Sequence, residues 1–139
     1  MKSVKRHLSL ICVVALVLAI MVPTVFAATT GYNYTYSFNL GSGGSKTYDG
    51  KDEKDFWYPS DEAATWSINV NSNSKTYVDT ATLYYIRSLK SDVEVETMSG
   101  IGAGSSDSRS FVGIDGKTYY AVINAMSNAG VYGTTNLSQ

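Results

Sequence analysis

Histidine and cysteine are almost absent from the chain, and proline is scarce. Among 139 residues there is one histidine, His7, one cysteine, Cys12, and only two prolines. The segment from residue 28 onward therefore has neither an imidazole nor a thiol, which excludes Ser-His-Asp and Cys-His catalytic devices from it. It cannot form a disulfide either, so a domain built from this segment depends on its hydrophobic core.

Basic residues are also in short supply after the first few positions. Three of the eleven Lys and Arg residues lie within the first six positions, which leaves eight against twelve Asp and Glu, a net charge of −4. This balance provides no basic patch, so nucleic acid is not an expected partner. An anionic membrane surface is disfavoured for the same reason, and modest acidity mainly favours solubility.

The first 27 residues have the order of a secretory signal peptide. A basic start precedes an apolar run over residues 8–22, Pro23 follows it, and Val25 and Ala27 occupy the two positions that a signal peptidase reads. The alternative is an uncleaved membrane anchor, but fifteen apolar residues span roughly 23 Å, short of the roughly 30 Å hydrocarbon core. We therefore expect cleavage after Ala27, no membrane attachment after cleavage, and a secreted, extracellular protein of bacterial origin.

Apolar and polar residues alternate with a period of two along most of the remaining chain. This is the strand period, and Thr, Tyr, Val and Ile, which suit a pleated surface, are frequent. The clearest case is Trp66, Ile68 and Val70, which we expect to lie in the core. The expected strands cover residues 32–40, 46–48, 65–71, 77–87, 93–95, 110–114, 117–124 and 131–137.

Turn residues separate these segments. Gly41 to Ser45, Ser99 to Ser108 and Ser127 to Gly130 are rich in Gly, Ser and Asn, which is typical of loops. Asp115-Gly116 is a pair that two-residue hairpins prefer, so we predict a hairpin between the strands on either side. No amphipathic helix is expected after the signal helix. The predicted fold is a single all-β domain over residues 28–139, an antiparallel β-sandwich of about eight strands with Greek-key or jelly-roll connections.

Several of these segments together resemble one family. An acidic stretch leads into an aromatic strand, an Asp precedes a strand with a Leu/Tyr pattern, and a hairpin-like pair closes the chain. The segments are Thr47 to Gly50, Asp52 to Tyr58, Trp66 to Val70, Asp79 to Ile86, Gly116 to Ile123 and Gly130 to Tyr132. In these features the chain resembles bacterial pre-peptidase C-terminal domains.

The resemblance implies a jelly-roll-like sandwich of the kind appended to exported hydrolases, where it assists secretion or binds polymeric substrates. The 139 residues include no hydrolase domain, so we expect a stand-alone copy. The aromatic strand over residues 32–40 has no counterpart in the family pattern.

Acidic residues gather between residues 49 and 62. Clustered loop carboxylates suit calcium, which accepts six to eight oxygen ligands in flexible geometry. We therefore expect that calcium, if any metal binds, is held by some of Asp49, Asp52, Glu53 and Asp55. The alternatives are a hydrated acidic loop and, less in keeping with a small sandwich, a pair of glycosidase carboxylates. No other cofactor is expected.

Three consecutive aromatic residues, Phe56, Trp57 and Tyr58, cannot all face the core of an extended segment. Neighbouring side chains point to opposite faces, so we expect Phe56 and Tyr58 to face inward and Trp57 to face outward. An exposed indole suits stacking on a sugar or a contact with a protein, so all three residues are predicted to be ligand-binding. The alternative is that Trp57 lies flat over the edge of the core.

These features favour a small secreted protein that is not an enzyme and binds an extracellular ligand, either a polysaccharide or a surface protein. One alternative is a self-associating structural protein of a surface matrix, because strands such as 32–40 are long, uncharged and suited to edge-to-edge pairing. Another is a secreted bacteriocin-like effector, for which the sequence offers no motif.

Overall fold

The computed structural model describes residues 32–139, and the expected signal peptide with its cleavage site after Ala27 lies outside them. The described part contains eight strands and one short helix. In chain order these are β1 (Asn33–Leu40), β2 (Thr47–Asp49), α2 (Gly50–Glu53), β3 (Ala63–Val70), β4 (Val78–Tyr85), β5 (Val93–Ile101), β6 (Ser106–Val112), β7 (Tyr119–Ala125) and β8 (Val131–Ser138). Among these residues, no helix has the length and apolar character needed to span a membrane.

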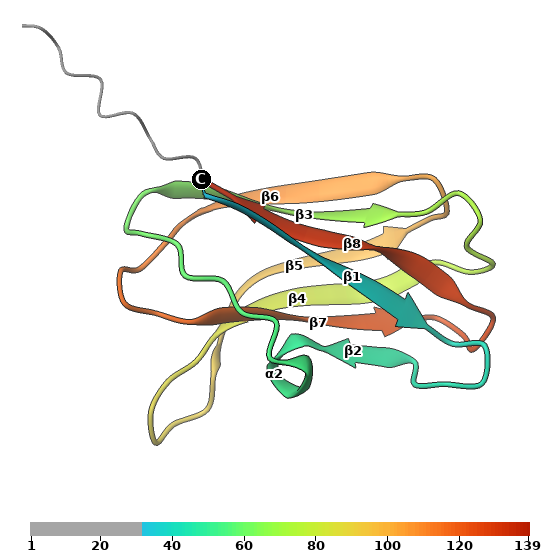
Figure 1. Cartoon of the computed structure of the whole chain (residues 1–139), viewed down its shortest axis with the longest axis horizontal. Coiled ribbons are helices and arrows are strands. Elements are labelled where there is room, and N and C mark those ends of the chain that lie inside the picture. Colours follow the sequence, from blue (N-terminus) through green and yellow to red (C-terminus); the bar gives the residue numbers. More distant parts are fainter. Residues whose placement is uncertain (1–31) are drawn as a thin grey trace, which may run out of the picture.

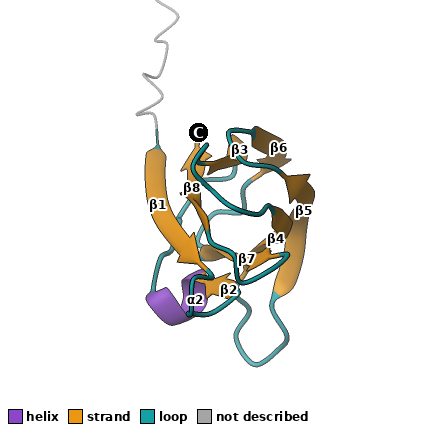
Figure 2. Ribbon diagram, turned by 90° about the vertical axis from the view of Figure 1, so that its right-hand side faces the viewer, coloured by secondary structure: helices purple, strands orange, loops and turns teal. Residues whose placement is uncertain are grey.

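The strands form two antiparallel sheets of four strands each. Their orders are β1-β8-β3-β6 in the first sheet, sheet A, and β2-β7-β4-β5 in the second, sheet B. Figures 1 and 2 show them as two layers, with α2 beside β2 at one edge. The expectation of an all-β chain of about eight strands in antiparallel sheets is confirmed.

One hydrophobic core lies between the two sheets and takes side chains from both. On β3, Trp66, Ile68 and Val70 are fully buried, as the alternation predicted. Leu83 of β4 and Ile123 of β7 contribute to the same cluster from sheet B. The period-two pattern therefore identified the inward face of the strands correctly.

The predicted hairpin at Asp115-Gly116 is wrong. β6 pairs with β3 in sheet A, whereas β7 pairs with β2 and β4 in sheet B, so the segment between them crosses from one sheet to the other. The turn itself exists, because the N–H of Lys117 donates to the carbonyl of Ile114 at 3.1 Å and Gly116 has φ +70°. A turn-forming pair fixes a local reversal of the chain but not which sheet the next strand joins.

The Gly/Ser-rich segment between residues 99 and 108 is less of a loop than predicted. β5 continues to Ile101 and β6 begins at Ser106, so both strands are longer than the sequence suggested. Met98 and Ile101 are buried, while Ser99 is exposed on the opposite face of β5. Small polar residues on the outer face of β5 therefore gave this part of the strand the composition of a loop.

Candidate functional site

Trp57 is fully buried, which contradicts its predicted outward orientation. Its N–H and C=O both pair with Tyr119 of β7 at 2.9 Å, beyond the point where β2 has ended. Directly opposite residues of an antiparallel pair share a face, and Tyr119 faces the core, so Trp57 does too. Tyr58 is instead the exposed member of the segment, at 61 %. Phe56 is half-buried.

The burial of both tryptophans makes a spectroscopic prediction. Trp57 and Trp66 are each completely shielded, so the folded protein should emit at short wavelength and iodide should fail to quench it. A Trp66→Phe variant isolates Trp57 and should behave in the same way, with a red shift only on unfolding. A long-wavelength component that iodide quenches in this folded variant would contradict the position of Trp57.

Tyrosine side chains gather next to Trp57 where β1 begins. We call Tyr32, Tyr34, Tyr36 and Tyr58 the tyrosine surface. Ring centroids lie 5.8 Å apart between Tyr32 and Tyr34 and 6.3 Å apart between Tyr34 and Tyr36. Tyr34 is 58 % exposed, comparable to Tyr58, although its parity on β1 is that of the buried Phe38. The inward face of β1 therefore leaves the core at this end and presents aromatic rings to solvent.

Hydrogen bonds fix the tyrosine surface to the segment that carries Trp57. The hydroxyl of Tyr36 donates to the carbonyl of Phe56 at 2.7 Å, and the N–H of Tyr58 donates to the hydroxyl of Tyr32 at 2.8 Å. The indole N–H of Trp57 donates to the carbonyl of Tyr34 at 3.0 Å. These contacts fix the rings of Tyr32 and Tyr36 and the backbone that carries the exposed Tyr34 and Tyr58 before any ligand arrives, which reduces the ordering cost of binding.

The hydroxyls of Tyr32 and Tyr36 are neutral at physiological pH. Burial raises the pKa of both Tyr32 and Tyr36 above the ordinary tyrosine value, and the charge of Asp55 acts in the same direction on Tyr36. Both hydroxyls therefore keep their protons: Tyr36 donates its proton to the carbonyl of Phe56, whereas the hydroxyl of Tyr32 accepts from Tyr58 and can still donate.

The four acids predicted to bind calcium are used in different ways. Asp49 caps α2 by accepting a hydrogen bond from the N–H of Lys51 at 2.9 Å. Asp55 accepts one from the hydroxyl of Tyr48 at 2.6 Å, while Asp52 and Glu53 are exposed on α2. Within residues 32–139, no group of three or more carboxylates, imidazoles or thiols is close enough to hold a metal ion. Calcium binding stays a prediction, without an assembled set of ligands to support it.

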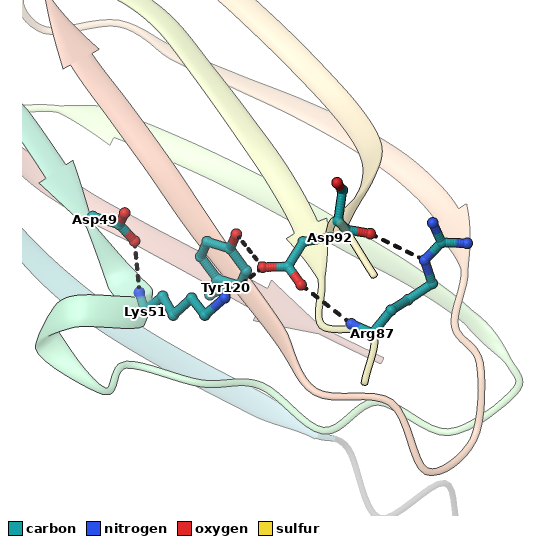
Figure 3. A network of polar contacts seen from close by, with 6 residues as sticks. Asp49, Lys51, Arg87, Asp92 and Tyr120 are labelled. Carbon is teal, nitrogen blue, oxygen red and sulfur yellow. Dashed lines mark hydrogen bonds and ion pairs between the residues drawn. The ribbon is translucent and has the colours of Figure 1, made fainter. Parts of the chain in front are cut away.

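A polar network around Asp92 joins α2, the loop between β4 and β5, and strand β7 (Figure 3). Its carboxylate contacts the Lys51 ammonium at 2.7 Å and accepts from the hydroxyl of Tyr120 at 2.9 Å and from the N–H of Arg87 at 3.2 Å. The hydrogen bond from Lys51 lowers the pKa of Asp92, so this carboxylate is ionised at neutral pH. Its interactions are lost as the pH falls through that lowered pKa. The network ties α2 and the β4–β5 loop to β7, which is a structural role.

Sequence reasoning missed this network because Lys51 and Asp92 are 41 positions apart. The strand expected over residues 77–87 lies just before Asp92 in the sequence, but nothing in it specified Lys51 as the partner.

The outer face of sheet A carries no charge. In register across β1, β8, β3 and β6 it presents three rows of four Ser, Thr or Asn residues. The rows are Asn33, Ser138, Thr65 and Ser110; Thr35, Asn136, Ser67 and Ser108; and Ser37, Thr134, Asn69 and Ser106. All twelve are exposed or half-buried, and we call them the uncharged face.

Few hydrogen bonds link the side chains of the uncharged face to each other. Asn136 donates to Asn33 and to Thr35, and the hydroxyls of Thr65 and Ser110 are 3.5 Å apart. Among the described residues these are the only side-chain hydrogen bonds within the face, so its remaining hydroxyls and amides face solvent. The sequence did not single out this surface, because it becomes visible only once the register of four strands is known.

Comparison with known proteins does not add a relative. No protein-family model matches the chain, and no curated protein matches it.

Proposed function

We propose that the chain is a secreted, non-catalytic β-sandwich that binds an uncharged polysaccharide through the tyrosine surface. The observation that carries the proposal is the pair of exposed rings, Tyr34 and Tyr58, next to Tyr32 and Tyr36, whose hydroxyls are hydrogen-bonded to the backbone of the segment that carries Tyr58. The C–H face of a sugar ring is apolar and its rim is polar. Tyrosine matches both properties with its flat ring and its hydroxyl.

The order of the strands supports a jelly-roll connection. The chain passes from β1 in sheet A to β2 in sheet B, and the last two strands return so that β8 lies beside β1 and β7 beside β2. Two four-stranded antiparallel sheets with this nested pairing are the arrangement of a double-sheet jelly roll. Kinship with pre-peptidase C-terminal domains is a further proposal that rests on the sequence patterns alone.

An uncharged ligand fits the electrostatics better than a charged one. The hydroxyls of Tyr32 and Tyr36 are uncharged at physiological pH, since burial raises their pKa further above it, and Asp55, which acts on Tyr36, is engaged by Tyr48. An anionic polysaccharide would find no cation among the four tyrosines, and the net charge of residues 28–139 would repel it. The absence of His and Cys from the same residues supports a binding role without catalysis.

Removing exposed rings should weaken polysaccharide binding. Retention on insoluble neutral glucan and on chitin, followed as a binding isotherm, should show about twofold to twelvefold weaker affinity for Tyr58→Ala and for Tyr34→Ala, since an aromatic contact contributes about 0.5–1.5 kcal/mol. Tyr77→Ala is the matched control, because Tyr77 is exposed at 39 % but lies before β4 of the other sheet. It should bind as the unchanged protein does.

Two outcomes would contradict this proposal. If the protein binds neither polymer, or if Tyr77→Ala weakens binding as much as Tyr58→Ala does, the tyrosine surface is not a polysaccharide site. Binding to whole cells that disappears after protease treatment, and persists after glycosidase treatment, would assign a surface protein as the ligand instead.

A further inference from the structure

The four edge strands of the two sheets differ in how they are protected against pairing with another chain. Edges are β1 and β6 in sheet A and β2 and β5 in sheet B. Natural sheets block their edges with short strands, charges, irregular register or inward-pointing charged residues. Three of the four edges have such a device.

β2 is only three residues long. β5 carries Glu94 and Glu96, and its pairing with β4 shifts register between Leu83 and Tyr84. β6 places an ion pair on its inner face. Asp107 lies opposite Ile68 and Arg109 opposite Trp66, and the two charged groups are 2.7 Å apart. Each of these features disfavours the approach of another strand.

β1 has none of these devices. It is eight residues long and contains no charged residue, no proline and no register shift in its pairing with β8. Its outward side chains are Asn33, Thr35, Ser37 and Asn39, all exposed. A long, regular and uncharged edge is the type that accepts an additional strand.

The backbone of β1 also has free hydrogen-bonding groups on its outer side. The N–H of Gln139 donates to the carbonyl of Tyr32, so even-numbered residues of β1 face β8 and odd-numbered ones face away from it. No hydrogen bond within residues 32–139 uses the N–H or C=O of Asn33, Thr35, Ser37 or Asn39. Figure 2 shows β1 at the rim of its layer with no strand beyond it.

We propose that β1 pairs antiparallel with β1 of a second copy of this chain, about a two-fold axis near the middle of the strand. Two identical edges are complementary in this arrangement, since each N–H meets a carbonyl, and no like charges come together. The pairing joins sheet A of both copies into one sheet and makes their uncharged faces continuous. Ser37, near the centre of β1, then lies opposite Ser37 or Thr35 of the second copy.

The test is a charge reversal at this central position. Sedimentation equilibrium of the purified protein should show a monomer–dimer equilibrium. Ser37→Lys and Ser37→Glu should each weaken it about tenfold or more, because like charges then meet across the axis. Mixing the two variants should restore the dimer, since Lys and Glu then face each other. Ser108→Lys, which adds the same charge to the outer face of β6, should leave the dimer unchanged.

Several results would overturn the proposal. One is a protein that stays monomeric at about 1 mM, where even a weak association is populated. Another is a Ser108→Lys variant whose dimer is weakened as much as that of the Ser37 variants. A third is a mixture of Ser37→Lys and Ser37→Glu that does not recover the dimer. Thermal melting of each variant checks that the fold is intact. The measurement needs no polysaccharide and Tyr58→Ala should dimerise normally, so failure of the dimer and failure of the proposed ligand are distinguishable.

Discussion

Replacing Trp66 with alanine is expected to lower the free energy of unfolding by about 3–5 kcal/mol. Trp66 is fully buried in the middle of sheet A, where it lies between Leu137 of β8 and Arg109 of β6 in register. Its indole N–H donates to the hydroxyl of Thr135 at 2.9 Å, and Thr135 is fully buried as well. The substitution therefore leaves both a cavity and a buried hydroxyl without its partner.

Chemical denaturation followed by circular dichroism measures this loss. Thr65→Ala is the matched control, because Thr65 is the neighbouring residue on β3 and its side chain lies on the outer face, half-buried. It should change stability by well under 1 kcal/mol, as outer-face substitutions usually do. A loss below about 1 kcal/mol for Trp66→Ala would mean that this side chain does not contribute to the core.

Replacing Gly133 with alanine is the second change with a large expected effect. In β8, Gly133 lies between Phe38 of β1 and Val70 of β3, and it is buried. A Cβ atom there would meet the carbonyl oxygen of Asn69 and would come within 2.6 Å of the Phe38 ring. Backbone of a central strand cannot move aside easily, so we expect a loss of about 1–3 kcal/mol or more from overpacking.

Gly102→Ala is the control for this change. Gly102 lies in the β5–β6 loop, and a Cβ atom there has nothing within 4 Å. That variant should unfold at the same denaturant concentration as the unchanged protein, or slightly higher, since alanine restricts the unfolded chain. If the two variants have equal midpoints, the close contact at Gly133 is not present in the folded protein.

The sequence predicted the strands and the buried face of β3 because side-chain alternation is a local property. Trp66, Ile68 and Val70 share a face whatever strands lie beside them. Pairing partners are not local, and this is why the hairpin at Asp115-Gly116 was wrong. β6 and β7 follow one another in the sequence but belong to different sheets. The same turn residues suit a hairpin within one sheet and a crossing between two sheets.

The predicted outward orientation of Trp57 was wrong for a related reason. Trp57 is not part of a continuous strand, and its orientation follows from a single bridge to Tyr119, which no pattern in residues 56–58 specifies. One of the three consecutive aromatic residues is exposed, but it is Tyr58 rather than Trp57. The exposure of Tyr34 depends on where the opposite sheet ends, and alternation along β1 contains no information about that.

The position of β8 between β1 and β3 has a consequence for how the chain folds. Ser138 pairs with Asn33 on one side and with Thr65 on the other, so the centre of sheet A is completed by a strand that is far from β1 and β3 in the sequence. Contacts of such high sequence separation form slowly, typically in milliseconds to seconds. Until β8 has been made, β1 has no partner in its sheet and sheet A cannot be completed. For a chain that is exported as proposed, slow completion of sheet A favours passage through a translocation channel before the domain has folded.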